Sequence, residues 1–289
     1  MRLAFTSDLH TDHHPANRAA WQAMVARLTA DPPDVFVCCG DVAADERCFG
    51  MTLLALRHLP CVKLFVPGNH DVWVRQRHWV ERGVTSERKY YELLPALCRE
   101  AGFHPLWLEP YVHGEVAFCG TMGWYDYSLR NRAFDAQLSL NDYRRKRYRE
   151  LVWSDRRYVV WPAAGRPLSD EQLAGRLVQA LGQQLLWARR RARRLVVVTH
   201  MLPFQAMVTH RQALPADYFS AFMGCSALGE AIQQVPEVAL ALAGHTHRPC
   251  TVTLGQLTAC TSPLGYAWQW QGRTPQEMAC DRLRLVHLD

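Results

Sequence analysis

Short runs of apolar residues in this sequence are each followed by a histidine, an aspartate or an asparagine. Five runs show this pattern, and the polar residues that follow them are Asp8 and His10, Asp41, Asn69 and His70, His200, and His245 and His247. Imidazole nitrogens and carboxylate or amide oxygens suit Mn²⁺, Fe and Zn²⁺ better than they suit soft metals. The set therefore predicts a site for divalent metal ions.

The number of candidate ligands indicates more than one ion. A tetrahedral ion with one open position takes three protein ligands, whereas this set offers seven. The seven are Asp8, His10, Asp41, Asn69, His200, His245 and His247. They suffice for two ions that share one carboxylate. Two ions ~3.5–4 Å apart can hold the attacking and the leaving oxygen of an in-line displacement at phosphorus.

Each of these residues alone also has a purely structural interpretation. Asp8 could cap a helix, His200 could be a hydrogen-bonded core histidine, and Gly40-Asp41 could form a turn. An account based on burial alone would have to place polar groups after five apolar runs by chance. The metal-site interpretation is therefore the better one.

The apolar runs that precede the polar residues are typical of buried strands. They are short and rich in Val, Leu and Phe, and they cover residues 3–6, 35–39, 62–66, 195–199 and 238–243, with a further run at 116–119. Ligands of open α/β sheets bind at the C-terminal ends of the strands. Parallel pairing of these strands would gather the candidate ligands at one edge.

Helices are predicted between the strands. Apolar residues recur at helical spacing over 16–29, and leucines repeat every four residues over 170–190, with Ser169 and Gln172 as a capping box at the start. From about residue 249 the pattern indicates strands at 250–254, 257–260 and 283–288. Strands that alternate with helices and then dominate the end of the chain predict an α/β sandwich with mixed sheets.

Length and composition agree with a globular protein. The 289 residues are 49% hydrophobic and 21% charged, and the net charge of +6 fits anionic substrates. The ten cysteines show no C-x-x-C spacing, which predicts reduced thiols and a cytoplasmic location. Because no apolar run approaches ~18 residues, we expect no membrane span.

As a series, the motifs resemble those of the calcineurin-like metallophosphoesterase family. They occur in the family's order as Asp8-x-His10, Gly40-Asp41, Gly68-Asn69-His70-Asp71, His200 and Gly244-His245-x-His247. The resemblance implies an α/β fold, namely a four-layer α-β-β-α sandwich of two mixed sheets. We expect a single domain over 1–289, with a helical or irregular insertion at about 123–168.

The resemblance also implies a role for each residue. Asp8, His10 and His247 would hold one divalent ion. Asn69, His200 and His245 would hold a second ion, and Asp41 would bridge both. Mn²⁺ is the expected metal, with Fe or Zn²⁺ as alternatives. A hydroxide bound at this centre would be the nucleophile.

Two further residues of the motifs are predicted to assist catalysis. In the family the residue at the position of His70 is no ligand and acts on the leaving group. Many members carry a second Asp that orients this His, but here Asp45 stands one residue later than in that pattern. We predict either that Asp45 positions His70 or that Asp45 is an exposed acid at a helix start.

The region 123–168 suggests the substrate. Trp124, Tyr125 and Tyr127 follow the run at 116–119 and are predicted to stack on a base or a sugar of the substrate. The alternative is an aromatic plug that packs the insertion against the body. The basic stretch 141–157 could follow a nucleic-acid backbone, or it could be a solvated arginine face.

The chain is therefore predicted to hydrolyse a phosphoester in a metal-dependent reaction. A phosphodiester, such as a nucleotide or a nucleic-acid end, is the expected substrate, because His70 supplies a group that can assist a leaving alcohol. A phosphomonoesterase and a catalytically silent binding protein of the same fold are the alternatives. The sequence does not identify a protein partner.

Overall fold

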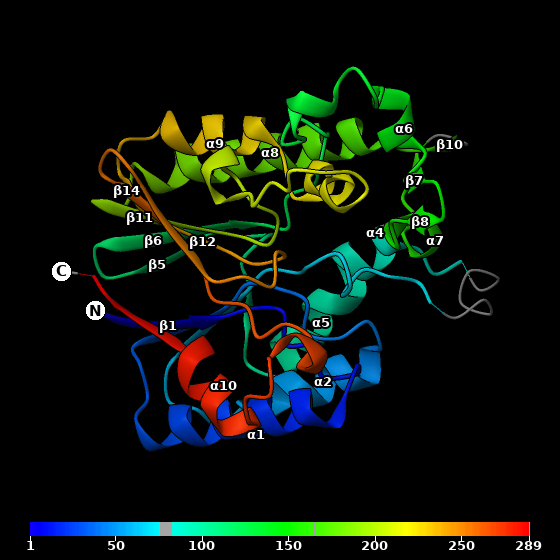
Figure 1. The fold of residues 1–289 in the computed structure, drawn as a ribbon. Helices are drawn as coiled ribbons and strands as arrows, with labels where there is room; N and C mark the ends of the chain where they lie inside the picture. The colour runs from blue at the N-terminus through cyan, green and yellow to red at the C-terminus, as the bar shows by residue number, and fades with distance from the viewer. Residues whose placement is uncertain (76–82, 164–165, 289) are drawn as a thin grey trace.

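Two mixed sheets stack face to face between two layers of helices (Figure 1). The computed structural model describes residues 1–75, 83–163 and 166–288. The predicted four-layer α-β-β-α sandwich is confirmed. Among the described residues, the model shows no helix that is both long and apolar enough to cross a membrane.

The first sheet has the strand order β15-β1-β2-β3-β4, in which the edge strand β15 runs antiparallel to β1 and the other strands run parallel to one another. Its strands are β1 (Arg2–Thr6), β2 (Val35–Cys38), β3 (Val62–Phe65), β4 (His104–Pro105) and β15 (Arg284–His287). The helices on its outer side are α1 (Pro15–Ala30), α2 (Glu46–Leu54), α5 (Leu94–Glu100) and α10 (Pro275–Arg282).

The second sheet has the strand order β13-β14-β12-β11-β6-β5, with antiparallel strands at both edges. Its strands are β5 (Tyr111–His113), β6 (Val116–Thr121), β11 (Arg194–Thr199), β12 (Val238–Ala243), β13 (Cys250–Leu254) and β14 (Leu257–Thr261). Helices α8 (Asp170–Ala188) and α9 (Ser226–Gln233) cover its outer face (Figure 1).

The predicted strands and the two predicted helices are confirmed to within a few residues. The run at 238–243 is fully apolar because β12 lies between two parallel neighbours, β11 and β14. In α8 the Ser169 hydroxyl accepts from the Gln172 backbone, so the predicted capping box is formed. Its leucines Leu173, Leu177, Leu181 and Leu185 are buried.

The C-terminal part of the chain is less regular than predicted. It contains the three expected strands, but α10 lies between β14 and β15 and packs against α1. Thr274 and Glu277 form a capping box at its start, and Pro275 occupies its first turn. The polar composition of α10 hides it from an analysis of apolar periodicity.

The region 123–168 contains only short elements, and its residues 164–165 lie outside the described part of the chain. These elements are α6 (Leu140–Arg144), β7 (Arg147–Tyr148), β8 (Leu151–Val152), α7 (Asp155–Tyr158), β9 (Pro162–Ala163) and β10 (Arg166–Pro167). A further short helix, α4 (Ser86–Arg88), precedes a single π-helical turn over Lys89–Leu93 and then α5. The interpretation of residues 1–289 as one domain stays a prediction.

Candidate metal centre

All seven predicted ligands converge at the C-terminal ends of five strands, three from the first sheet and two from the second. Asp8 and His10 follow β1, Asp41 follows β2, Asn69 follows β3, His200 follows β11, and His245 and His247 follow β12. Six of the seven side chains are buried, and His247 is the exception at 12% side-chain exposure. A buried cluster of this kind fits a ligand set, because unpaired polar groups are costly inside a protein.

The backbone of these ligands is held in an uncommon conformation. Nine non-glycine residues in the described chain have a positive φ between 45° and 74°. Five of the nine are candidate ligands, namely Asp8, His10, Asp41, His245 and His247. Such residues cost energy and cluster at functional sites. Their concentration here is an observation that points to function independently of the residue types.

Two glycines make room for the side chains of Asp41 and His200. A Cβ atom on Gly68 would lie 2.1 Å from Oδ1 of Asp41, and one on Gly40 would lie 2.8 Å from Nδ1 of His200. Gly40 also has a φ of +86°, which side chains other than glycine rarely adopt. The glycines of the Gly-Asp and Gly-Asn motifs are therefore required by close approach at the centre.

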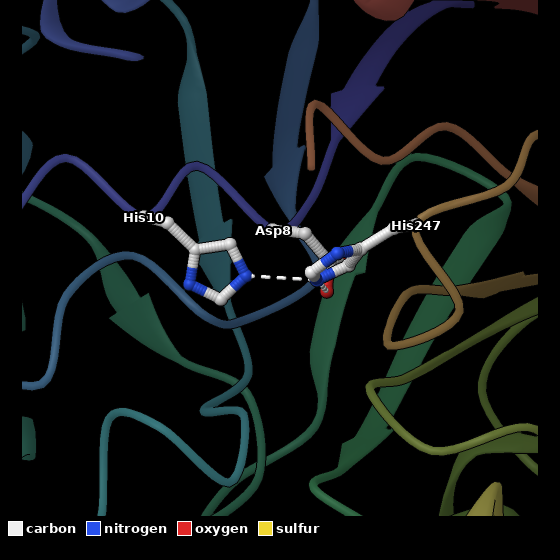
Figure 2. A group of neighbouring side chains, drawn as sticks. All are labelled: Asp8, His10 and His247. Atoms are coloured by element: carbon white, nitrogen blue, oxygen red, sulfur yellow. Dashed lines mark hydrogen bonds and ion pairs between the residues drawn. The ribbon is translucent and has the colours of Figure 1, made fainter. Parts of the chain in front are cut away.

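One group of ligand atoms comes from Asp8, His10 and His247 (Figure 2). The Nε2 atoms of His10 and His247 lie 2.9 Å apart, and Nε2 of His247 is 3.5 Å from Oδ1 of Asp8. All three ligand atoms lie within 4.8 Å of one another. This spacing allows a single cation to contact all three.

A second group comes from Asp41, His200 and His245, with Asn69 beside them. Nε2 of His200 lies 3.4 Å from Oδ2 of Asp41 and 3.2 Å from both Oδ1 of Asn69 and Nδ1 of His245. The same Oδ2 of Asp41 is 3.8 Å from Nε2 of His10 in the first group. Asp41 therefore stands between the two groups.

The outward nitrogens of three histidines are bound to oxygen acceptors. Nδ1 of His200 lies 2.8 Å from the carbonyl of Cys39, and Nε2 of His245 lies 3.2 Å from the carbonyl of Phe222. Nδ1 of His247 lies 2.8 Å from Oε1 of Gln269. A carbonyl acceptor fixes the N–H on the outer nitrogen and leaves the lone pair of the inner nitrogen free for a metal.

The electrostatics of the cluster fit cations. Burial lowers the pKa of both His10 and His245 well below the usual value, so their rings are neutral and can donate a lone pair. Burial alone would raise the pKa of Asp41, but His200 and His70 outweigh it and lower that pKa well below its usual value. His200 differs, because Asp41 outweighs burial and raises its pKa to about 9, while burial raises the pKa of Asp8. Metal binding at these two residues would therefore release protons.

Asp155 is a buried residue that the sequence analysis missed. Its Oδ1 accepts from Nδ2 of Asn69 at 3.0 Å and from the Trp73 indole at 2.6 Å. Its Oδ2 accepts from the Tyr125 hydroxyl at 3.0 Å and from the Trp153 indole at 2.8 Å. Since Asp155 takes the amide N–H of Asn69, the amide oxygen is left to face His200.

His70 lies at the margin of the centre, between the two groups and two aromatic rings. Its Nε2 is 3.9 Å from Oδ2 of Asp41, and its ring stacks on Trp73 at 3.5 Å. The Tyr266 hydroxyl lies 3.5 Å from the same nitrogen. Tyr266 and Trp73 carry no motif, so only the structure identifies them.

The predicted contact between Asp45 and His70 is not found. Asp45 is half-buried and caps α2, where its Oδ1 accepts from the Cys48 backbone at 2.8 Å. Across the described chain, no hydrogen bond or ion pair joins Asp45 to His70. The alternative of a helix-start acid is what the structure shows, although Asp45 is less exposed than expected.

The prediction that Trp124, Tyr125 and Tyr127 contact the substrate is wrong in this structure. All three side chains are buried with no exposed surface. Trp124 and Tyr127 donate to Asp170 of α8, and Tyr125 donates to Asp155. They form the aromatic plug that was the alternative, because their polar atoms find partners inside the protein.

The basic stretch 141–157 is partly neutralised, because four of its seven cations lie within 4.0 Å of a carboxylate. Arg144 pairs with Glu171 at 2.7 Å, Lys146 with Asp170 at 2.7 Å and Arg147 with Glu150 at 3.6 Å. The arginines of these pairs are about half exposed. This arrangement favours the solvated face over a track for a nucleic-acid backbone.

Comparisons with known proteins agree with the geometry of the centre. The profile of the calcineurin-like phosphoesterase family matches residues 1–249. Over 131 residues the chain is 30% identical to the [acyl-carrier-protein] phosphodiesterase PptH of Mycobacterium tuberculosis, which covers 43% of this chain and 37% of that protein. In sequence, the chain thus spans little more than a third of this curated relative.

Solved structures are similar over a larger part of the chain. The phosphopantetheinyl hydrolase PptH from Mycobacterium tuberculosis superimposes with a TM-score of 0.77 and 23% identity, over 99% of this chain and 96% of that chain. A putative 5'-nucleotidase from Staphylococcus aureus superimposes with a TM-score of 0.46 and 14% identity, over 90% of this chain and 48% of the other.

The family profile covers well over half of the chain. All seven residues to which the resemblance assigns a metal-binding role lie in the convergent cluster. This chain belongs to the calcineurin-like phosphoesterase family.

Proposed function

We propose that this chain hydrolyses a phosphodiester at a centre of two divalent cations. Asp41 carries the proposal, because its Oδ2 lies within 4 Å of His10, a member of the first ligand group, and of His200, a member of the second. Asp8, His10 and His247 would hold one cation. Asn69, His200 and His245 would hold the other, with Asp41 shared. When bound, the two cations activate water and neutralise charge on the phosphoryl oxygens.

His70 would act on the leaving group. Its ring is kept beside the cluster by the stacked Trp73, and its backbone N–H donates to Oδ1 of the shared Asp41 at 2.8 Å. Burial lowers the pKa of His70 to about 4 although Asp41 opposes the shift, so the free protein holds a neutral ring with one N–H. That N–H can donate to the oxygen that leaves phosphorus.

The proposed substrate class is a phosphodiester that joins a phosphopantetheine group to a carrier protein. PptH of Mycobacterium tuberculosis is named an acyl-carrier-protein phosphodiesterase, and this chain is 30% identical to it over 131 residues. The expectation of a nucleotide rests on the aromatic residues, which the structure buries, and on the basic stretch 141–157, which is partly paired with carboxylates. A nucleotide therefore remains an outcome of the substrate test and no longer its leading candidate.

Mn²⁺ and a cytoplasmic location complete the proposal. The ligand set of imidazoles, carboxylates and one amide suits Mn²⁺, while Fe and Zn²⁺ are the alternatives. All ten cysteines are free thiols, as is usual in a reducing compartment.

The test compares three substrates on the purified, Mn²⁺-loaded protein. These are bis-p-nitrophenyl phosphate, p-nitrophenyl phosphate and an acyl carrier protein that bears phosphopantetheine. The proposal expects faster turnover of the diester than of the monoester, and release of phosphopantetheine from the carrier. The Asp41→Asn variant, purified identically, controls for contaminating phosphatases.

Other outcomes lead to different functions. Turnover of the monoester alone would make the protein a phosphatase. Absence of all turnover, with two metals bound per chain, would favour the silent binding protein.

A further inference from the structure

A cavity of about 710 Å³ opens beside the metal centre, on the side of His247. We call it the arginine groove and define it by Arg211, Arg248, Trp268, Gln269, Arg273 and Arg282. Gln269 accepts from Nδ1 of the ligand His247, and Arg248 follows that ligand directly in the chain. The groove therefore begins at the metal centre and leads away from it.

The charged side chains in the described lining of the groove are positive. Four arginines line it, and none of the described residues in its lining is an aspartate or a glutamate. Arg273 and Arg282 are balanced by Asp281, at 2.7 and 3.3 Å. Arg211 and Arg248 are exposed, and no described carboxylate lies within 4.0 Å of either guanidinium. The groove thus offers two uncompensated positive charges to a ligand.

Two stacked aromatic rings connect the groove to the candidate metal ligands. Trp268 is 73% exposed, which is unusual for a side chain of this size, and it stacks on Tyr266 at 5.9 Å. The Tyr266 ring lies 4.5 Å from His10 and 4.6 Å from His247. A molecule that binds against Trp268 is therefore only two aromatic rings away from the metal ligands.

We propose that the arginine groove docks an acidic face of the protein that carries the scissile phosphodiester. Exposed tryptophan and arginine are the residues most enriched where protein partners bind tightly. Because the groove starts at the metal centre, the body of a carrier whose phosphodiester is being cleaved would lie over it. This inference rests on the proposed function, which supplies the protein-bound substrate.

The charges favour a protein over a nucleic acid. A nucleic-acid backbone presents regularly spaced phosphates and is bound through many cations at once. Here only Arg211 and Arg248 lack a carboxylate partner among the described groove residues, and four of the seven cations in the stretch 141–157 pair with carboxylates. Two free arginines and one tryptophan suit a compact acidic patch.

The test uses variants in three separate segments of the groove. Arg211→Glu and Arg248→Glu reverse the free charges, and Trp268→Ala removes the exposed ring. For each variant, kcat and KM are measured on a phosphopantetheinylated acyl carrier protein and on bis-p-nitrophenyl phosphate, together with the Mn²⁺ content. We expect KM for the carrier to rise about tenfold, with a smaller change in kcat.

The control is another exposed arginine. Arg190 lies after α8, close to the start of β11, whereas the metal centre lies at the far ends of the strands. Arg190→Glu should keep the wild-type ratio of kcat/KM between the carrier and the small diester, while the groove variants lower that ratio about tenfold. The wild-type ratio itself should fall as salt rises, because the docking is electrostatic.

The outcomes separate the two proposals. If the wild type cleaves the carrier and the groove variants keep the wild-type ratio of kcat/KM between the carrier and the small diester, the docking inference is overturned. The proposed function then stands. If the wild type cleaves the small diester but not the carrier, the proposed substrate fails, and the docking inference fails with it. If the groove variants lose activity on a polynucleotide that the wild type prefers, the occupant is a nucleic acid and not a protein.

Discussion

His70 differs from His200 and His245, because aromatic rings hold it and, among the described residues, no carbonyl oxygen is bonded to its ring. Trp73 stacks on it at 3.5 Å, and Tyr266 approaches its Nε2. A ring held in this way can keep its position while its N–H points toward a substrate. By contrast, the outward nitrogens of His200 and His245 are bound to carbonyls, so only their inward nitrogens are free.

His70→Ala should therefore separate catalysis from metal binding. We expect the variant to bind two Mn²⁺ ions per chain and to lose turnover of a diester by about 10²–10⁴-fold, the range for general acid–base catalysis. Metal content is measured by elemental analysis, and turnover with bis-p-nitrophenyl phosphate. His13→Ala is a matched control, since that ring also contacts Tyr266 but touches no ligand. A loss of one metal in His70→Ala would instead make His70 a ligand.

Asp155 connects the insertion to one specific ligand. It orients Asn69 through Oδ1 and is itself held by Tyr125 and Trp153 through Oδ2. Asp155→Asn should weaken binding of the second Mn²⁺ by about 10–100-fold, as is typical when a partner of a ligand is lost. An asparagine has only one acceptor oxygen for donors on both sides. Calorimetric titration with Mn²⁺ measures both binding steps.

Tyr125→Phe is the control for this prediction. It removes one donor to the other oxygen of Asp155 and leaves the contact with Asn69 in place. We expect two Mn²⁺ binding steps close to those of the wild type. If Asp155→Asn also binds both ions like the wild type, the orientation of Asn69 does not depend on Asp155.

At the scale of elements, the loops after β2 and β3 are tied together by a buried lysine. Lys89 lies just before α5, and its ammonium contacts Glu46 at 2.7 Å, the carbonyl of Trp73 at 2.6 Å and that of Ala44 at 3.3 Å. Its side chain is fully buried. The two loops that it joins carry Asp41 and Asn69, so Lys89 supports the centre from behind.

Lys89→Met should lower the free energy of unfolding by about 3 kcal/mol, because it leaves Glu46 without its partner in a buried site. Denaturant unfolding in the presence of excess chelator measures this effect without a contribution from metals. Arg88→Met provides the comparison, since Arg88 pairs with Glu92 on the surface at 3.0 Å. That variant should cost less than about 1 kcal/mol. Equal losses in both variants would contradict the structural role of Lys89.

The elements that position the centre could be predicted because their signals are local. Each strand that carries a ligand is an apolar run, and the polar ligand follows within a few residues of its end. The run Val238–Ala243 followed by His245 is an example. Asp155 could not be predicted in this way, since it lies 86 residues from Asn69 and carries no motif. The same holds for Gln269, whose contact with His247 depends on the fold of a loop.

The aromatic residues show a second limit of the sequence. Trp124 and Tyr127 follow a strand, as the sequence predicts. Whether they are exposed depends on Asp170, which lies 46 residues after Trp124 and 43 residues after Tyr127. A buried acceptor turns an aromatic residue with a polar atom into a core residue. Residue type and spacing alone do not distinguish that case from a substrate platform.

At the scale of the whole molecule, each ligand group draws on both sheets. Asp8 and His10 come from the first sheet and His247 from the second, while Asp41 and Asn69 face His200 and His245 across the same boundary. Bound cations would therefore cross-link the two sheets at one edge. They would also stabilise the positive-φ conformations of the ligand residues, which otherwise cost energy.

Metal removal should consequently loosen the boundary between the sheets and lower the thermal stability. At a Mn²⁺ concentration a hundredfold above Kd, each site adds about 2.7 kcal/mol, which for a chain of this size corresponds to a rise in Tm of roughly 4–5 °C per site. Thermal unfolding with Mn²⁺ and with chelator measures the change. The Asp41→Asn variant, which lacks the shared carboxylate, should respond weakly to Mn²⁺.

Hydrogen exchange distinguishes a cross-link from a local effect. Mn²⁺ should slow amide exchange both in the loop after β1 and in the loop after β12, although the two lie at opposite ends of the sequence. The loop at 189–193 precedes β11, so it lies at the opposite end of that strand from the metal centre. Its amides should exchange at the same rate with and without the metal. Protection confined to the loops of one sheet would contradict a centre shared between the sheets, because a cation bound by ligands of one sheet alone cannot restrain the other.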